Sequence, residues 1–181
     1  MNTQTISIET KQISLQGFDL TEIINGVEVM SPSPFRKHQD IVQNINRIID
    51  NYIYSKKLGK VYISPLDVIF EEGINRLQPD LIFIKKENMA IAQDWIRGVP
   101  DMVCEVISQG SYHKDTETKR AIYERYKVPE YWIIIPELKT VEILVIEGEK
   151  YIIFSCAEGE GVVNSKVIKG LQVDIKYVFE E

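Results

Sequence analysis

Two acidic residues stand inside apolar segments that are typical of β-strands. Asp80 precedes the run Leu81-Ile82-Phe83-Ile84, and Glu105 lies within Met102-Val103-Cys104-Glu105-Val106-Ile107. A buried carboxylate is costly unless it gains a strong partner, and two carboxylates close together raise each other's pKa. A divalent cation would resolve both problems. Oxygen donors with no thiolate or imidazole cluster beside them favour Mg²⁺, or Mn²⁺ in its place, over zinc.

A lysine follows these two acids on the next predicted helix. The ammonium group of Lys119 is the kind of group that offsets negative charge in a transition state. Asp80 and Glu105 as metal ligands, with Lys119 beside them, indicate metal-assisted cleavage of a phosphodiester bond.

A purely structural interpretation of the same residues stays open. Asp80 would cap a turn after Pro79, and Glu105 would pair with Lys119 or Arg97 inside the fold. Acids embedded in apolar strands are rare, so the two together favour a functional site more than either acid does alone.

The helix that carries Lys119 presents two further polar residues on the same face. Asp115, Lys119 and Tyr123 recur every four residues, so a helix over 114–126 aligns them. A short loop after the Glu105 strand would return that face toward the end of the strand. The alternative is an ordinary surface pair of Asp115 and Lys119, with Tyr123 packed beside it.

Three more residues are candidates for supporting roles. His38 lies on a long predicted helix and either lines the cleft or lies at the surface between Lys37 and Gln39. Asp67 and Glu28 each lie among apolar residues of a predicted strand. Both are candidate metal ligands or supporting groups, although such residues often simply alternate outward on a strand.

The spacing of apolar residues, and the Gly and Pro residues that interrupt helices and strands, predict the elements that position these side chains. The long helix at 35–57 has an apolar stripe at helical spacing, with Ser33 as its expected cap and Pro34 in its first turn. The other expected elements are a short helix at 17–24, strands at 27–30, 61–70 (interrupted at 64–65) and 81–84, a turn at 71–75, a short helix at 88–94, a strand at 131–135, a hairpin at 141–155 and an alternating segment at 171–179.

This order of elements predicts an α/β fold in which a mixed sheet is extended by an antiparallel C-terminal meander. The 181 residues suit one domain, 1–181, large enough to bury a core. No apolar run approaches the roughly 20 residues of a membrane helix, and Met1 to Lys11 is polar, unlike a signal peptide. We therefore expect a cytoplasmic protein without membrane contact.

Charge and cysteine content narrow the function classes further. The net charge of −6 argues mildly against a general nucleic-acid binder, because phosphate contacts need clustered bases. Bases outnumber acids only locally, between His113 and Lys127. Two cysteines, Cys104 and Cys156, form neither a disulfide framework nor a zinc site, and we expect both to be packing residues.

Several of these segments, in this order, resemble the Uma family of restriction endonucleases within the PD-(D/E)XK nuclease superfamily. The resemblance covers about residues 15–147 and rests on Asn25 to Pro32, His38, Gln78-Pro79-Asp80-Leu81, Cys104 to Ser108, the Asp115/Lys119/Tyr123 helix and Val128 to Trp132. It implies a restriction-endonuclease-like mixed β-sheet core flanked by helices.

The same resemblance implies a function and a site. It implies a Mg²⁺-dependent endonuclease acting on DNA, in which Asp80 and Glu105 bind the metal and Lys119 orients or activates the attacking water. The chain departs from the superfamily motif, since the position two residues after Glu105 is Ile107 and not lysine. Lys119 would then be the substitute. The alternative is a catalytically inactive nuclease-fold protein that acts as a nucleic-acid-binding or oligomeric module. A homodimer would suit a small nuclease, since cutting two strands takes two sites, and the hairpin at 141–155 would supply a pairing edge.

Overall fold

The computed structural model describes residues 20–30, 33–108 and 114–180 of the chain. Within these ranges the strands form sheets of six, five and two strands. The six-stranded sheet has the order β11-β10-β9-β8-β6-β3, and its strands are β3 (Gly59–Ile63), β6 (Leu81–Lys85), β8 (Met102–Val106), β9 (Glu130–Ile135), β10 (Thr140–Glu147) and β11 (Lys150–Glu158). β8 and β9 pair in parallel and the other neighbours are antiparallel, so the sheet is mixed as predicted.

The other strands of the described residues form two smaller sheets. The five-stranded sheet, in the order β2-β1-β5-β4-β7, contains β1 (Thr21–Ile24), β2 (Val27–Met30), β4 (Val68–Glu71), β5 (Asn75–Leu77) and β7 (Ile96–Arg97). The third sheet is the antiparallel pair of β12 (Val162–Asn164) and β13 (Gln172–Asp174).

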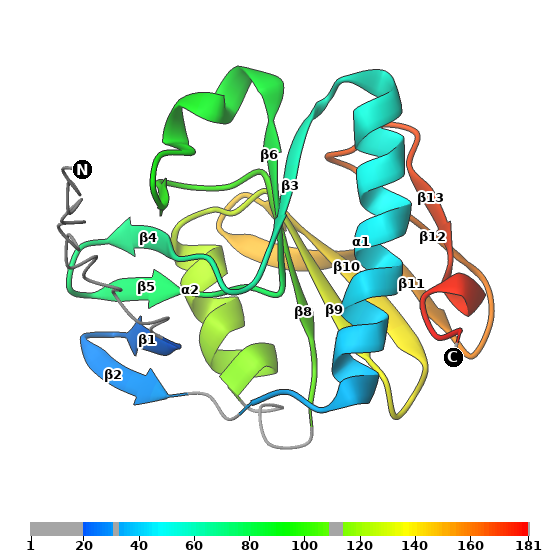
Figure 1. Cartoon of the computed structure of the whole chain (residues 1–181), viewed down its shortest axis with the longest axis horizontal. Helices are drawn as coiled ribbons and strands as arrows, with labels where there is room; N and C mark the ends of the chain where they lie inside the picture. The colour runs from blue at the N-terminus through cyan, green and yellow to red at the C-terminus, as the bar shows by residue number, and fades with distance from the viewer. Residues whose placement is uncertain (1–19, 31–32, 109–113, 181) are drawn as a thin grey trace, which may run out of the picture.

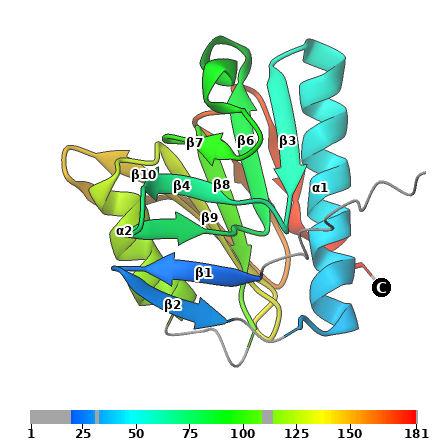
Figure 2. The same ribbon diagram turned by 60° about the vertical axis from the view of Figure 1, so that its left-hand side comes forward.

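Helices cover both faces of the six-stranded sheet. They are α1 (Arg36–Lys56), the 3₁₀ helices η1 (Lys86–Ile91) and η3 (Ile175–Tyr177), the π-helical segment η2 (Lys114–Lys119) and α2 (Arg120–Arg125), which continues η2. Figures 1 and 2 show α1 and α2 on opposite sides of this sheet. None of the helices in the described ranges is long and apolar enough to span a membrane.

The core follows from the alternation of side chains along the central strands. Isoleucines of α1, including Ile45 and Ile49, pack with one face of the sheet, where Leu81 and Cys104 lie. Residues of the opposite face, such as Val103, pack with Ile122 and Tyr123 of α2. Buried apolar surface on both faces is what stabilises a sheet between two helical layers. The predicted fold class is therefore confirmed.

Two local predictions near the N-terminus were wrong. The segment predicted as a short helix at 17–24 is, over its described part, the strand β1, which forms a hairpin with β2. Asn25 and Gly26 have φ values of 50° and 79°, as the residues of a tight hairpin turn require. Ser33 does not cap α1, because the N-cap is Phe35 and makes no side-chain cap hydrogen bond.

The strand predicted at 61–70 was also wrong as a single element. β3 belongs to the six-stranded sheet and β4 to the five-stranded sheet, with the cis Ser64-Pro65 peptide between them. The predicted turn at 71–75 exists, but it joins β4 to β5 rather than to β6. Pairing partners distant in sequence decide this arrangement, and local patterns do not reveal them.

The C-terminal third confirms the meander and adds a buried anchor. β9, β10 and β11 pair in sequence as antiparallel neighbours. Glu130, fully buried on β9, accepts hydrogen bonds from Ser165 Oγ (2.6 Å) and from the backbone N–H groups of Lys166 (2.6 Å) and Val167 (2.9 Å). This carboxylate holds the segment between β12 and β13 against the sheet.

Candidate active site

Asp80 and Glu105 lie where β6 begins and the neighbouring strand β8 ends. In the β6/β8 pair Leu81 faces Cys104, so Asp80 precedes β6 next to the end of β8. The backbone N–H of Val106 donates to Asp80 Oδ2 at 2.8 Å. In Figure 1 this end of β8 lies at the same edge of the molecule as the start of α1. The two acids predicted to act together are therefore adjacent.

Glu105 is tied to the helix that follows it. Its Oε1 lies 2.9 Å from Lys119 Nζ and accepts a hydrogen bond of 2.7 Å from the Tyr123 hydroxyl. Glu105 and Lys119 are each 3% exposed, and Tyr123 is fully buried. Of the two structural alternatives, Glu105 pairs with Lys119, whereas Arg97 pairs with Glu72.

Strand alternation explains why Glu105 points to this helix. Val103 packs on the α2 side of the sheet, and Glu105 follows it by two residues, so it falls on the same face. Lys119 ends the π-helical segment and Tyr123 lies in α2, which places both side chains on Glu105. Short π-helical stretches occur frequently at functional sites. Lys119 is not part of a surface pair, because it is buried between carboxylates.

A second buried carboxylate binds the same lysine, and the sequence analysis missed it. Glu22 of β1 is 2% exposed, and its Oε1 lies 3.0 Å from Lys119 Nζ. The same oxygen accepts a hydrogen bond of 2.9 Å from the backbone N–H of Gln78, two residues before Asp80. Glu22 lies in an apolar strand as Glu105 does, so the same signal marks it. It was overlooked because its segment was predicted to be helical.

His38 and Asp67 lie around this centre. His38 Nε2 lies 3.1 Å from Asp80 Oδ2, so the long helix contributes a side chain to the site rather than to the surface. Asp67 accepts a hydrogen bond of 2.8 Å from the Gln78 side chain and lies 3.8 Å from Arg76 Nε. Asp67 therefore contacts the segment that leads into Asp80.

The remaining two candidates are not brought to the centre. Glu28 is exposed on β2, where it faces Ile23 across the hairpin, whereas Glu22 pairs with Val29. Residues paired across a hairpin share a face, so Glu28 lies on the face opposite Glu22. The side chain of Asp115 lies outside the described part of the structure.

The electrostatics of the centre are dominated by negative charge. Glu22 and Glu105 both bind the ammonium group of Lys119, and Asp80 lies beside Glu105, where it accepts a hydrogen bond from the Val106 N–H. Burial, followed by the charge of Glu105, raises the pKa of Tyr123 well above its usual value, so its hydroxyl stays a hydrogen-bond donor. Burial and the charges of Asp80 and Glu105 likewise raise the pKa of Cys104. An additional cation would relieve this excess.

The donor set fits Mg²⁺ better than a metal that needs a preformed cage. Among the described residues, no three His, Cys, Asp or Glu side chains form a ready metal cluster. Mg²⁺, however, is commonly held by one or two carboxylates, with water and substrate phosphate completing its shell. Within the described ranges, both hydrogen bonds of the Asp80 carboxylate are at Oδ2, which leaves Oδ1 for a ligand. Asp80 and Glu105 are the residues that would hold the ion.

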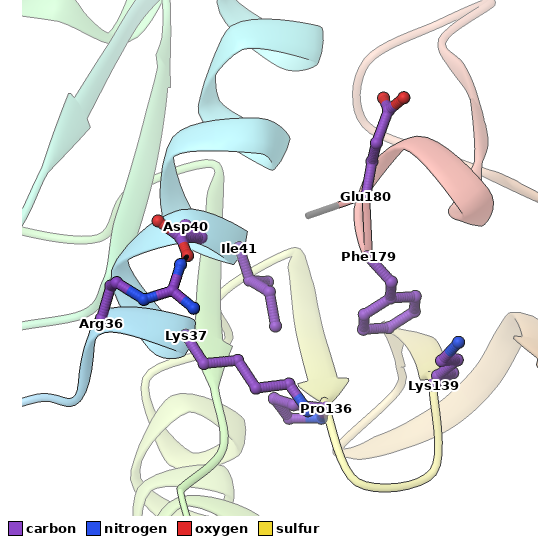
Figure 3. Close-up of a pocket in the computed structure, with 8 residues that line it drawn as sticks. All are labelled: Arg36, Lys37, Asp40, Ile41, Pro136, Lys139, Phe179 and Glu180. Carbon is purple, nitrogen blue, oxygen red and sulfur yellow. Dashed lines mark hydrogen bonds and ion pairs between the residues drawn. The ribbon is translucent and has the colours of Figure 1, made fainter.

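A pocket opens beside this centre, at the first turn of α1. Its volume is about 150 Å³, and Arg36 and Lys37 line it together with residues of the C-terminal third. Figure 3 shows these side chains around the pocket. His38, the next residue of the helix, contacts Asp80.

Comparisons with known proteins identify the family of the chain and a solved structure with a similar fold. The sequence model of the family Uma2, described as "Putative restriction endonuclease", matches residues 18–176. A crystal structure from Anabaena variabilis, described as "a putative nuclease belonging to DUF820", superposes with a TM-score of 0.73 at 18% identity. The match covers 88% of this chain and 89% of that one, and at this identity it shows the fold alone. No curated protein matches the sequence.

Proposed function

The chain belongs to the Uma2 family, whose description is "Putative restriction endonuclease", and on that premise we propose that it is a Mg²⁺-dependent endonuclease that hydrolyses phosphodiester bonds in DNA. The observation that carries the proposal is the convergence of Asp80, Glu105 and Lys119 at the adjoining ends of β6 and β8. Mn²⁺ would substitute for Mg²⁺, since both prefer oxygen ligands.

The two carboxylates have distinct surroundings in this proposal. The Val106 N–H and His38 fix the orientation of Asp80, and Lys119 and Tyr123 fix that of Glu105. A bound ion would lower the pKa of a water molecule and stabilise charge on the phosphate. Positioned carboxylates lower the cost of binding that ion, because little side-chain freedom is lost.

Lys119 supplies the positive charge in this proposal. Its ammonium group would offset the negative charge that develops on the phosphate and orient the attacking water. Glu22 holds Nζ independently of Glu105, so the lysine keeps its position when Glu105 turns toward a metal ion. The Glu22 hydrogen bond to Gln78 N–H also ties Lys119 to the segment that carries Asp80.

A second candidate function is a nuclease fold that binds nucleic acid without cleaving it. The burial of Lys119 between two carboxylates favours this alternative, because such an arrangement also suits a structural ion pair. The two functions differ in whether the protein cleaves DNA. Only the first requires turnover that depends on both the metal and the lysine.

Cleavage of supercoiled plasmid and of single-stranded DNA in Mg²⁺ or Mn²⁺ tests the proposal. We expect Asp80→Asn, Glu105→Gln and Lys119→Met each to lower the cleavage rate by about 100-fold or more, as removal of a charge-stabilising group commonly does. Asp101→Asn is the matched control, since Asp101 is a buried acid near the start of β8, away from the site. Circular dichroism checks that each variant is folded.

The outcomes separate the two candidates. Metal-dependent nicking that Asp101→Asn retains and the other three lose supports the endonuclease. Nicking at the wild-type rate by folded Lys119→Met would remove Lys119 from the mechanism. Wild-type protein that binds DNA but never nicks it in either metal ion would favour the non-cleaving module.

A further inference from the structure

A cationic and aromatic surface lies at the start of α1, next to the candidate active site. We call it the α1 surface and define it by Phe35, Arg36, Lys37 and Lys139. The Phe35 side chain is 82% exposed, although apolar rings of this size are usually covered. Lys37 and Lys139 are exposed as well. Phe35 directly precedes Arg36 and Lys37 in the chain, and exposed rings and cations are the two components of single-stranded nucleic-acid binding.

The cations of this surface converge on one pocket. Arg36 and Lys37 of α1 and Lys139 from the β9–β10 turn all line it, and Pro136 and Phe179 contribute apolar walls. Figure 3 shows Lys37 extended toward Pro136, with Phe179 on the other side of the pocket. Two distant parts of the chain, 36–37 and 139, thus present positive charge around one hollow.

Acidic residues do not cancel this charge. Asp40 pairs with Arg36 within α1, and exposed pairs of this kind contribute little energy, so the guanidinium can exchange to another anion. Glu180 also lines the pocket, but in Figure 3 its carboxylate points away from Lys37. Neither Lys37 nor Lys139 forms an ion pair with another residue of the described ranges. Both ammonium groups are therefore available to an anionic ligand, in a chain whose net charge is −6.

We propose that the α1 surface binds the nucleic-acid strand on one side of the scissile phosphodiester. Lys37, Lys139 and Arg36 contact backbone phosphates, and an unpaired base stacks on Phe35. This inference rests on the proposed function, which makes Asp80 part of the cleavage site. His38, in the same helical turn as Arg36 and Lys37, contacts Asp80, so a strand bound to this surface leads to that site. A ring this exposed can stack on a base only where the base is unpaired, so the surface favours single-stranded over fully paired DNA.

The test measures binding, independently of cleavage. Fluorescence anisotropy of labelled polythymidine and of a blunt duplex is recorded with Asp80→Asn protein, which binds without cutting. Within this background we expect Phe35→Ala to weaken polythymidine binding about five-fold or more and duplex binding less, since the variant loses the ring on which an unpaired base stacks. Tyr54→Ala is the control, because Tyr54 is equally exposed, at 82%, near the opposite end of α1.

The lysines are tested through salt dependence. Each phosphate contact on a single strand contributes about 0.7 to the slope of log affinity against log salt. The double variant Lys37→Ala/Lys139→Ala should therefore lower that slope by about 1.4. The pair Lys60→Ala/Lys86→Ala, two exposed lysines from β3 and η1, should leave it unchanged.

Failure of this inference differs from failure of the proposed function. If Asp80→Asn protein does not bind polythymidine at low salt, or if both sets of variants match their controls, the α1 surface is not a nucleic-acid contact. If the wild type fails to cleave but the α1 variants lose binding as expected, the endonuclease proposal fails and the contact surface stands.

Discussion

Glu22 and Lys119 form a buried ion pair, with 3.0 Å between Oε1 and Nζ, that joins the first hairpin of the chain to the helix after β8. Glu105 binds the same Nζ at 2.9 Å. Two buried carboxylates therefore share one ammonium group. Burying such an unbalanced cluster is costly unless further hydrogen bonds or another cation stabilise it. Tyr123 and the Gln78 N–H supply the hydrogen bonds, and we propose that the metal supplies the cation.

Removing Glu22 should destabilise the fold and weaken metal binding. We expect Glu22→Ala to lower the free energy of unfolding by about 1–3 kcal/mol, because the Gln78 N–H loses its acceptor in a buried site. Urea denaturation measures this. Glu22→Gln retains an acceptor oxygen and should be more stable, yet calorimetry should show weaker Mg²⁺ binding, since buried negative charge is lost. Glu28→Ala, an exposed change in the same hairpin, should alter neither quantity.

Tyr123 should make stability sensitive to alkaline pH. Its pKa is raised in the folded state, so the unfolded chain releases this proton first as pH rises past about 10. Below that pH, Tyr123 contributes fully to the free energy of unfolding. Above it, this contribution falls by up to about 1.4 kcal/mol per pH unit. Urea denaturation between pH 8 and pH 11 should give a shallower decline for Tyr123→Phe. Equal slopes for both proteins would contradict the role of Tyr123; Tyr177→Phe, an exposed change, is the control.

The two cysteines should differ in reactivity. Partial burial raises the pKa of Cys156, and full burial with the charges of Asp80 and Glu105 raises that of Cys104 well above its usual value. Cys156 is nevertheless exposed, contrary to the prediction that both are packing residues, whereas Cys104 is buried. Only the thiolate reacts quickly with a disulfide reagent. At pH 8 we expect one thiol per native chain to react with Ellman's reagent and two after denaturation, and Cys156→Ser should abolish the native signal. A remaining native signal would show that Cys104 is accessible.

Glu130 should matter for stability but not for cleavage. It is buried and accepts hydrogen bonds from Ser165, Lys166 and Val167. Glu130→Ala leaves these donors without an acceptor, so we expect a loss of about 3 kcal/mol or more in urea denaturation. The exposed Glu137→Ala should change stability by less than about 0.5 kcal/mol. A Glu130→Ala protein as stable as wild type would show that the carboxylate is dispensable.

A homodimer remains a prediction, and β11 is the strand that would form it. This strand is an edge of the six-stranded sheet, and Ile152, Ile153 and Phe154 are exposed on it. Exposed apolar edge strands tend to pair with other chains. Sedimentation equilibrium should show a dimer that Ile153→Lys converts to a monomer, whereas Leu138→Lys, an equally exposed change elsewhere, does not. A wild-type monomer across the concentration range would contradict the prediction.

Local patterns predicted the parts of the site that depend on local geometry. Helical spacing predicted that Lys119 and Tyr123 share one face of a helix that returns toward the Glu105 strand, and their shared contact with Glu105 confirms it. Glu22 was missed because four apolar-rich residues before Asn25-Gly26 fit a helix end or a hairpin equally well. Only the pairing of β1 with β5, distant in sequence, decides between them. The catalytic roles of Asp80, Glu105 and Lys119 stay predictions.

The spread of the site along the chain also bears on how the protein is made. Its contacts join residues 22, 38, 80, 105 and 119, so an N-terminal fragment that ends before Lys119 lacks part of the set. The other four residues leave the ribosome before Lys119 does, so Glu22 and Glu105 are synthesised before the ammonium group that they share. An emerging chain therefore cannot assemble the proposed cutting centre before Lys119 has been added.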